Sequence, residues 1–199
     1  MVLRERLPYY AYDAIDTLID AVKAGTTPSQ RNALGLVGKK MARLLFRVTN
    51  YVTPLRILQV GAATGVESVV MLGVNSESRL WLYDPDLEEN PVVPSVLQTQ
   101  LDRIECFAEE SVAIDAFLAA NGEPTMTLLN KAVGEDVVSR LLDAKTVVVM
   151  ANLQRNKAMD QLFDACCRHM TIGQTFTNGK IAIIIPNPKL QREDFVLWL

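Results

Sequence analysis

From Leu55 onward, short and nearly continuous apolar runs alternate with segments of helical periodicity. The runs are RILQV (56–60), RLWLY (79–83), RIECF (103–107), TMTLL (125–129) and TVVVM (146–150). Strands that are apolar along their whole length are buried on both faces, as in a parallel sheet covered by helices. The intervening segments, near residues 65–74, 92–101, 111–121, 135–142 and 156–169, therefore predict crossover helices. The pattern predicts an α/β fold with a doubly wound, Rossmann-like and mostly parallel sheet.

The end of the chain breaks this alternation. TIGQTFT (171–177) and KIAIII (180–185) flank Asn178-Gly179, a dipeptide typical of a tight β-hairpin. We predict that these two segments form an antiparallel pair that closes the sheet, which gives seven strands. Pro186 and Pro188 end the last strand, and we expect KLQREDFVLWL (189–199) to leave the sheet as a short tail.

Helices are expected ahead of the sheet. One is predicted over 9–24, and the capping box Thr27-Pro28-Ser29-Gln30 predicts a second helix running to about Asn50. Lys39, Arg43 and Arg47 recur every four residues along this second helix. Such a basic row is typical of a solvated face, with an anionic partner as the alternative.

Length and composition indicate one domain covering 1–199, with N-terminal helices in 1–52 and a Rossmann-like core in 53–199. The chain has 199 residues, of which 49% are apolar and 22% charged, as in ordinary soluble domains. A net charge of −3 argues against a nucleic acid or an anionic membrane as partner. The N-terminus has no apolar signal segment, and no run reaches the roughly 18 apolar residues that span a bilayer, so we expect a cytoplasmic protein.

The cysteine and histidine content argues against several kinds of site. Cys106, Cys166 and Cys167 lack the spacing of zinc ligands, and His169 is the single histidine. We expect small apolar cysteines in a reducing compartment and a structural histidine.

The stretch LRILQVGAATGVESVVML (55–72) joins the first predicted strand to a helix through two glycines. In an open α/β sheet this first turn is the usual ligand position. Gly61 permits a tight turn with close approach of a ligand to the backbone, and Gly65 lets the helix pack near the strand. The alternative is a ligand-free helix start, because Thr64-x-x-Glu67 matches a capping box. A Glu67 carboxylate in the first helical turn would compete with a phosphate, which favours a cofactor without phosphate groups over a dinucleotide.

Asp84 ends the second strand about twenty residues after the glycines. An acid at this position can accept hydrogen bonds from both ribose hydroxyls of a nucleoside, with Asp86 as its neighbouring alternative. Turn formation in YDPD (83–86) is the competing explanation, because Asp is common before Pro in turns.

The sequence at this point resembles the class I S-adenosylmethionine-dependent methyltransferases, in particular their bacterial O-methyltransferase-like branch. KKMARLLFRVTNYVTPLRILQVGAATGVES is similar to that branch's helix and glycine motif, and RLWLYDPD to its second strand with the ribose-binding acid. ANLQRNKAMDQLF resembles the segment after its fifth strand, and TIGQTFTNGKIAIIIPNPKLQREDFVLWL its terminal hairpin and tail, which implies a complete chain. The resemblance implies S-adenosylmethionine as cofactor and a binding site made of Gln59, Gly61, Ala63, Gly65, Asp84 and Asn130.

Several of the positions that match the family's motifs carry other residues. Gln59 replaces an acid, Ala63 the central glycine and Asn130 the acid after the fourth strand, while Ala151 and Asn152 replace an acidic pair after the fifth. Neutral amides supply oxygen ligands without charge compensation and cannot take a proton, so we expect no metal site and no metal-assisted catechol-type chemistry. We assign no catalytic residue. A neutral hydrogen bond from Gln59 in place of a charge-assisted one predicts cofactor binding weakened by about one or two orders of magnitude.

Two hypotheses for the function follow. In the first, the chain is a metal-independent methyltransferase for an unidentified small molecule, since methyl transfer from a sulfonium depends mainly on proximity and alignment. In the second, it is a catalytically inactive relative that serves as a binding or regulatory module and could pair as a homodimer. Arg155 and Lys157 are candidates for meeting an anionic substrate, and Trp81 and Trp198 for exposed apolar anchors at an interface. Tyr9, Tyr10 and Tyr12 are expected to anchor the first helix to the core, with an aromatic lid as the alternative.

Overall fold

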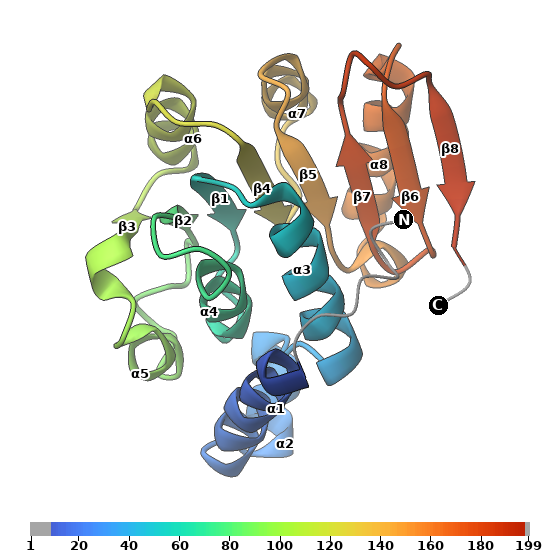
Figure 1. Cartoon of the computed structure of the whole chain (residues 1–199). Coiled ribbons are helices and arrows are strands. Elements are labelled where there is room, and N and C mark those ends of the chain that lie inside the picture. The colour runs from blue at the N-terminus through green and yellow to red at the C-terminus, as the bar shows by residue number, and fades with distance from the viewer. Residues whose placement is uncertain (1–8, 198–199) are drawn as a thin grey trace.

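The computed structural model describes residues 9–197, and five parallel strands form its centre (Figure 1). These are β1 (Arg56–Val60), β2 (Arg79–Tyr83), β3 (Ile104–Phe107), β4 (Thr125–Leu129) and β5 (Val147–Met150). Their order is β3-β2-β1-β4-β5, so the chain winds outward from β1 in both directions. The predicted doubly wound α/β fold is confirmed, and all five apolar runs form strands. Helices bury most of β1, β2, β4 and β5, whereas the edge strand β3 is partly exposed.

The sheet within the described residues has eight strands, so the predicted number of seven was wrong. β7 (Ala182–Ile185) pairs antiparallel with both β5 and β6 (Gln174–Thr177), which confirms the C-terminal antiparallel hairpin. The expected tail instead contributes β8 (Glu193–Val196), which pairs parallel with β6. Phe195 of β8 stacks on Phe176 of β6 with ring centroids 4.9 Å apart, and this contact fixes the added strand.

The turn of the hairpin is longer than the dipeptide predicts. Thr177 pairs with Ala182, so four residues lie between β6 and β7. Asn178 Oδ1 accepts hydrogen bonds from the backbone N–H groups of Lys180 and Ile181, and Gly179 takes the left-handed conformation with φ 76°. The Asn side chain therefore organises the turn by local hydrogen bonding.

Helices cover both faces of the sheet. One hydrophobic cluster lies under α1 (Tyr9–Ala24), α3 (Lys39–Val52), α4 (Val66–Leu72) and α5 (Val93–Leu97), and the other under α6 (Glu110–Ala119), α7 (Glu135–Asp143) and α8 (Lys157–His169) (Figure 1). Short 3-10 turns, η2 (Leu101–Arg103) and η3 (Leu153–Arg155), precede β3 and α8. None of the helices in residues 9–197 is long and apolar enough to cross a membrane.

The N-terminal segment contains three helices where two were predicted. The first matches the predicted range, and Thr27 and Gln30 form the reciprocal capping box that starts α2 (Pro28–Leu34). This helix stops at Gly35, which takes a left-handed C-cap conformation with φ 70°, and α3 begins after Gly38. The expected continuous helix from Thr27 to about Asn50 is therefore broken, because two glycines in four residues favour a turn.

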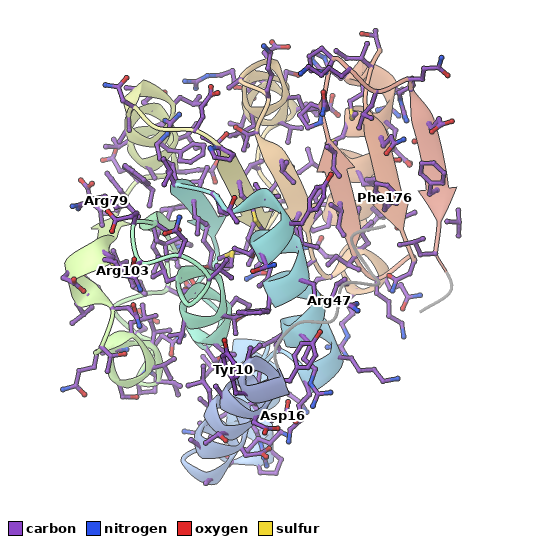
Figure 2. The ribbon with its side chains drawn as sticks, viewed as in Figure 1. Tyr10, Asp16, Arg47, Arg79, Arg103 and Phe176 are labelled. Atoms are coloured by element: carbon purple, nitrogen blue, oxygen red, sulfur yellow. The ribbon has the colours of Figure 1, made fainter. Side chains whose placement is uncertain are left out.

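Two cations of the predicted basic row face carboxylates of α1. Arg43 donates to Asp16 through Nε at 3.2 Å and Nη2 at 2.6 Å, and Lys39 Nζ lies 2.7 Å from Asp20 Oδ2. Figure 2 shows Asp16 on α1 and Arg47 further along α3. These ion pairs join α1 to α3 across the inter-helix contact.

The aromatic candidates fall in different environments. Tyr12 packs partly buried against the core with the Arg43 guanidinium 5.2 Å from its ring centroid, whereas Tyr10 is 75% exposed. Only Tyr12 of these two therefore anchors α1, and the side chain of Tyr9 lies outside the described set. Trp81 is buried and contacts Phe117 edge to face at 5.9 Å, so it belongs to the core and is no exposed anchor. Trp198 lies outside the described residues.

Candidate functional site

The turn between β1 and α4, residues 61–65, lies at the carboxyl end of the central strand, between the ends of β2 and β4. Gly61 and Gly65 take left-handed backbone conformations with φ 89° and 79°. Ala63 also has a positive φ, 49°, although a Cβ makes this region costly by about 1–2 kcal/mol. The turn therefore keeps a backbone shape that suits glycine at a position where this chain has alanine.

Both glycines of this turn are approached closely by other parts of the chain. A Cβ added at Gly61 would lie 3.1 Å from Asn130 Cβ and 3.2 Å from Lys131 Cγ. A Cβ added at Gly65 would lie 3.2 Å from Leu97 Cδ2, a residue of α5. The two residues after β4 therefore cover the first glycine, and α5 covers the second.

Gln59 is fully buried and bridges β1 to α4. Its Nε2 donates to the carbonyl oxygen of Gly61 at 3.0 Å, and its Oε1 accepts from Ser68 Oγ at 2.7 Å. Both polar ends of the side chain are engaged within the protein, so Gln59 holds the turn in place.

Asn130 follows β4 and contacts the same backbone group. Its Nδ2 donates to the carbonyl oxygen of Gly61 at 3.0 Å, so that oxygen accepts two side-chain amide hydrogen bonds. Asn90 supports the turn from the other side, with Nδ2 donating to the carbonyl oxygen of Ala63 at 2.6 Å. Three amide side chains thus fix the turn, two of them at positions singled out in the sequence.

Asp84 lies at the end of β2 with its carboxylate directed at the turn. The residue is 6% exposed, and Oδ2 accepts from the backbone N–H of Ala62 at 2.7 Å. Oδ1 accepts from the N–H of Asp86 at 3.1 Å and from Lys131 Nζ at 2.6 Å. Burial alone would raise the pKa of Asp84, but the hydrogen bonds from Lys131, Ala62 and Asp86 outweigh burial and hold it below the usual value. Asp84 is therefore an ionised carboxylate beside the glycine turn.

Lys131, like Asn90, is a site residue that the sequence prediction missed. Its Nζ also lies 2.7 Å from Asp86 Oδ2, so one ammonium group joins two carboxylates from the end of β2. A single lysine after a strand is an ordinary surface residue in sequence. Only the adjacency of β2 and β4 to β1 brings Lys131 to Asp84.

Thr64 and Glu67 do not form the predicted capping box. Gly65 is the N-cap of α4 and makes no side-chain capping hydrogen bond, while Thr64 Oγ1 and Glu67 Oε2 are buried without a hydrogen-bond partner. Burial raises the pKa of Glu67 to about 7, which makes this carboxyl largely neutral in mildly acidic solution. The chain enters α4 through the left-handed conformation of Gly65, so Gly65 and not Thr64 occupies the N-cap position.

The structure resembles solved methyltransferases over most of its length. A methyltransferase from Podospora anserina with S-adenosylhomocysteine bound matches 91% of this chain and 98% of its own at 14% identity, with a TM-score of 0.63. A methyltransferase from Geobacter sulfurreducens gives a TM-score of 0.64 at 15% identity, with 85% and 87% covered. The O-methyltransferase TomG of Streptomyces achromogenes, bound to S-adenosylmethionine, gives 0.60 at 14% identity, with 92% of each chain covered. The sequence matches no protein-family model and no curated protein.

The chain has the class I methyltransferase fold. In this fold, the motif positions Gln59, Gly61, Ala63, Asp84 and Asn130 gather around one turn at the carboxyl edge of the sheet, joined by the hydrogen bonds given above. Gly65 closes the turn as the N-cap of α4. The structure therefore brings all six residues of the predicted cofactor site together.

The segment after β5 has a structural role in this methyltransferase fold. Ala151 is buried, and Asn152 takes a left-handed conformation with φ 63°. Asn156 caps α8 by accepting from the N–H groups of Ala158 and Met159, which agrees with the predicted start of that helix. Arg155 and Lys157 are exposed at the entry to α8.

The described residues contain no group of three or more His, Cys, Asp and Glu side chains that could hold a metal ion. Burial raises the pKa of the Cys166 thiol to about 12, so this cysteine is a buried thiol and a poor nucleophile. His169 lies at the surface with Nε2 3.5 Å from Asp143 Oδ1.

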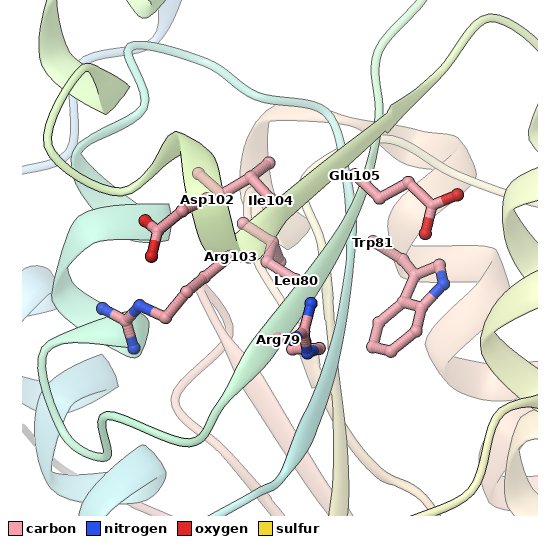
Figure 3. A pocket seen from close by; sticks show the side chains of 7 residues that line it. All are labelled: Arg79, Leu80, Trp81, Asp102, Arg103, Ile104 and Glu105. Carbon is pink, nitrogen blue, oxygen red and sulfur yellow. The ribbon is translucent and has the colours of Figure 1, made fainter.

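A small cavity of about 60 Å³ lies elsewhere, where β2 and β3 begin (Figure 3). It is lined by Arg79, Leu80, Trp81, Asp102, Arg103, Ile104 and Glu105. The Arg103 guanidinium donates to the carbonyl oxygens of Leu72 and Asn75 and so closes the end of α4. The cavity is at the edge of the sheet opposite to the glycine turn and forms no part of that site.

Proposed function

We propose that the protein is a metal-independent, S-adenosylmethionine-dependent methyltransferase that acts on a small molecule. The nucleoside end of the cofactor would be held by Asp84 over the turn of residues 61–65. The observation that carries this proposal is the position of Asp84, a buried and ionised carboxylate whose Oδ2 is fixed by the N–H of Ala62 in the glycine turn.

The donor and acceptor chemistry of the turn fits a nucleoside. A carboxylate has about four acceptor sites, and the described contacts of Asp84 use three, one of them for the mobile end of a lysine. Ribose hydroxyls are donors that such a carboxylate accepts. Gly61 presents no Cβ to a ligand, and the space beside it is taken up by Asn130 and the flexible side chain of Lys131.

The chemistry would be supplied by the bound sulfonium, whose methyl group is already activated for transfer. The chain's contribution would be to bind and align the reactants, since well-aligned groups react without a metal. The amide and alkyl groups of Asn130, Ala151 and Asn152 supply neither charge for a divalent cation nor a base for a hydroxyl nucleophile. The acceptor would therefore be a group that is nucleophilic without deprotonation by these residues.

Calorimetric titration with S-adenosylmethionine and S-adenosylhomocysteine tests the proposal. We expect wild type to bind both in the presence of EDTA, and Asp84→Asn to lose at least tenfold in affinity because a charge-assisted hydrogen bond to ribose is lost. Asp164→Asn is the matched control, since Asp164 is exposed on α8, away from the glycine turn. Absence of binding to wild type at millimolar ligand would refute the proposal.

A second candidate function is a non-catalytic binding or regulatory module. It is favoured by the side chains of Gln59 and Asn130, which are neutral and donate their amide N–H groups to the Gly61 carbonyl oxygen, within the protein itself. Incubation with methyl-labelled S-adenosylmethionine and mixtures of phenols, amines and thiols separates the two functions. Labelled product supports the enzyme, whereas cofactor binding without any labelled product supports the module.

A further inference from the structure

The side chain of Lys131 lies across the glycine turn. Its Cγ would be 3.2 Å from a Cβ added at Gly61, so its aliphatic part lies against the backbone of this glycine. Its Nζ lies 2.6 Å from Asp84 Oδ1 and 2.7 Å from Asp86 Oδ2. Lys131 thus fills the space over Gly61 and at the same time binds one carboxylate oxygen of Asp84.

The ion pair is stronger at Asp84 than at Asp86. The Asp84 side chain is 5% exposed and that of Asp86 is 73% exposed, so solvent screens the second contact far more than the first. Both donors make charge-assisted hydrogen bonds to the ionised Asp84, but the ammonium adds the attraction of a full positive charge, which a ribose hydroxyl lacks. A nucleoside that reaches Asp84 Oδ1 must therefore displace a stronger donor.

The displacement is sterically accessible. The Lys131 side chain is 41% exposed, and its outer partner Asp86 can keep the ammonium when Asp84 releases it. The lysine can therefore leave Gly61 and Asp84 without becoming an unpaired buried charge.

We propose that Lys131 is a specificity-determining residue that competes with the ribose hydroxyls of a nucleoside for Asp84. This inference rests on the proposed function, because it concerns the same nucleoside site. The occupant that Lys131 excludes is a ligand with a free ribose diol. Its removal opens the site, and only ligands that use Asp84 gain from the opening.

The test compares wild type, Lys131→Met and Lys131→Gln in titrations with S-adenosylhomocysteine, adenosine and 2′,3′-dideoxyadenosine. We expect the two variants to bind S-adenosylhomocysteine and adenosine about tenfold more tightly than wild type, and dideoxyadenosine no more tightly. Lys189→Met is the matched control, because it removes one exposed cation between β7 and β8, away from the glycine turn. We expect its affinities to equal those of wild type.

A second measurement uses the wild-type protein, so that it does not depend on the variants folding. Acetylation of lysines, read by mass spectrometry, should modify Lys131 faster when S-adenosylhomocysteine is bound, because the ammonium leaves the buried carboxylate. Lys189 should react at an unchanged rate.

The outcomes separate the two proposals. Binding to wild type that Lys131→Met leaves unchanged, or an equal gain for dideoxyadenosine, overturns the inference and leaves the proposed function standing. Binding to Lys131→Met alone supports the inference and identifies a site closed by this lysine. No binding to wild type or to any variant overturns both proposals, since an opened Asp84 would then bind no nucleoside.

Discussion

Gln59 Oε1 accepts a hydrogen bond of 2.7 Å from Ser68 Oγ, which ties the end of β1 to the first turn of α4. The other end of the same amide donates to the carbonyl oxygen of Gly61. A carboxylate at residue 59 could accept from Ser68 but could not donate to Gly61. An amide at residue 59 therefore has a structural reason in this chain.

Replacing Gln59 with glutamate should destabilise the protein. The new carboxyl would be fully buried and would face the Gly61 carbonyl oxygen, so its ionised form is disfavoured and its pKa is expected to rise above the unfolded value. The loss of stability is small below the unfolded pKa and increases as pH rises through the folded pKa. We expect about 3 kcal/mol lower free energy of unfolding at pH 8, measured by urea denaturation.

The exposed Gln161 of α8 provides the control for this substitution. Gln161→Glu should change the free energy of unfolding by less than about 0.5 kcal/mol. A Gln59→Glu protein as stable as wild type at pH 8 would contradict the structural role assigned to the amide.

Glu67 predicts a second pH dependence. Burial raises its pKa from 4.5 to about 7, so the folded protein binds this proton more tightly than the unfolded chain does. The stability that the neutral carboxyl provides is complete below pH 4.5 and is lost as pH rises through about 7. Glu67→Gln should remove this loss and raise the free energy of unfolding at pH 8 by about 3 kcal/mol relative to wild type.

Denaturant titrations at pH 5 and pH 8 measure the effect of Glu67→Gln as a difference between the two proteins. Glu77→Gln, at an exposed position, should show the same pH dependence as wild type. Parallel wild-type and Glu67→Gln curves over this range would mean that the Glu67 carboxyl ionises without hindrance in the folded protein.

The parallel part of the fold was predictable because its signal is local. β1, β2 and β4 coincide with their apolar runs, since burial on both faces favours apolar residues along most of a strand. β8 was missed because all four of its residues, EDFV, are exposed, so its sequence carries no burial pattern. It is a strand through its backbone pairing with β6 and the Phe195–Phe176 contact, neither of which the sequence displays.

Some residues of the candidate site were likewise predictable from local sequence, and others were not. Gly61, Gly65 and Asp84 were predictable, since glycine turns and acids at strand ends follow from position along the chain. The contact of Lys131 with Asp84 depends on β2 and β4 flanking β1, an order that no local pattern specifies. The burial of Glu67 was equally invisible, because a single acid at the start of a helix ordinarily points to solvent.

Gly173 should be the least replaceable glycine near the added strand. It has φ 88°, and a Cβ there would overlap the carbonyl oxygen of Ile185, while its own carbonyl oxygen accepts from the N–H of Glu193 at the start of β8. Gly173→Ala should lower the free energy of unfolding by about 3 kcal/mol, because backbone of β7 has to move. Thermal unfolding measures this, with Gly25→Ala as the control, since its Cβ would meet only ordinary contacts of 3.7 Å and beyond. Equal melting temperatures for the two variants would show that the β6–β7 edge is not packed as described.

Substituting Ala63 and Ala62 by glycine should change the free energy of unfolding in opposite directions. Ala63 has φ 49°, where an alanine is strained and a glycine is not, whereas Ala62 lies outside the positive-φ region and is fully buried. Relief of strain, offset in part by the greater entropy of glycine in the unfolded chain, should make Ala63→Gly more stable by about 0.5–1 kcal/mol. Ala62→Gly should be less stable by about 1 kcal/mol, because it removes a buried methyl and adds the same entropy. Urea denaturation of the two variants decides the matter, and destabilisation by both would mean that the turn does not hold Ala63 in the left-handed region.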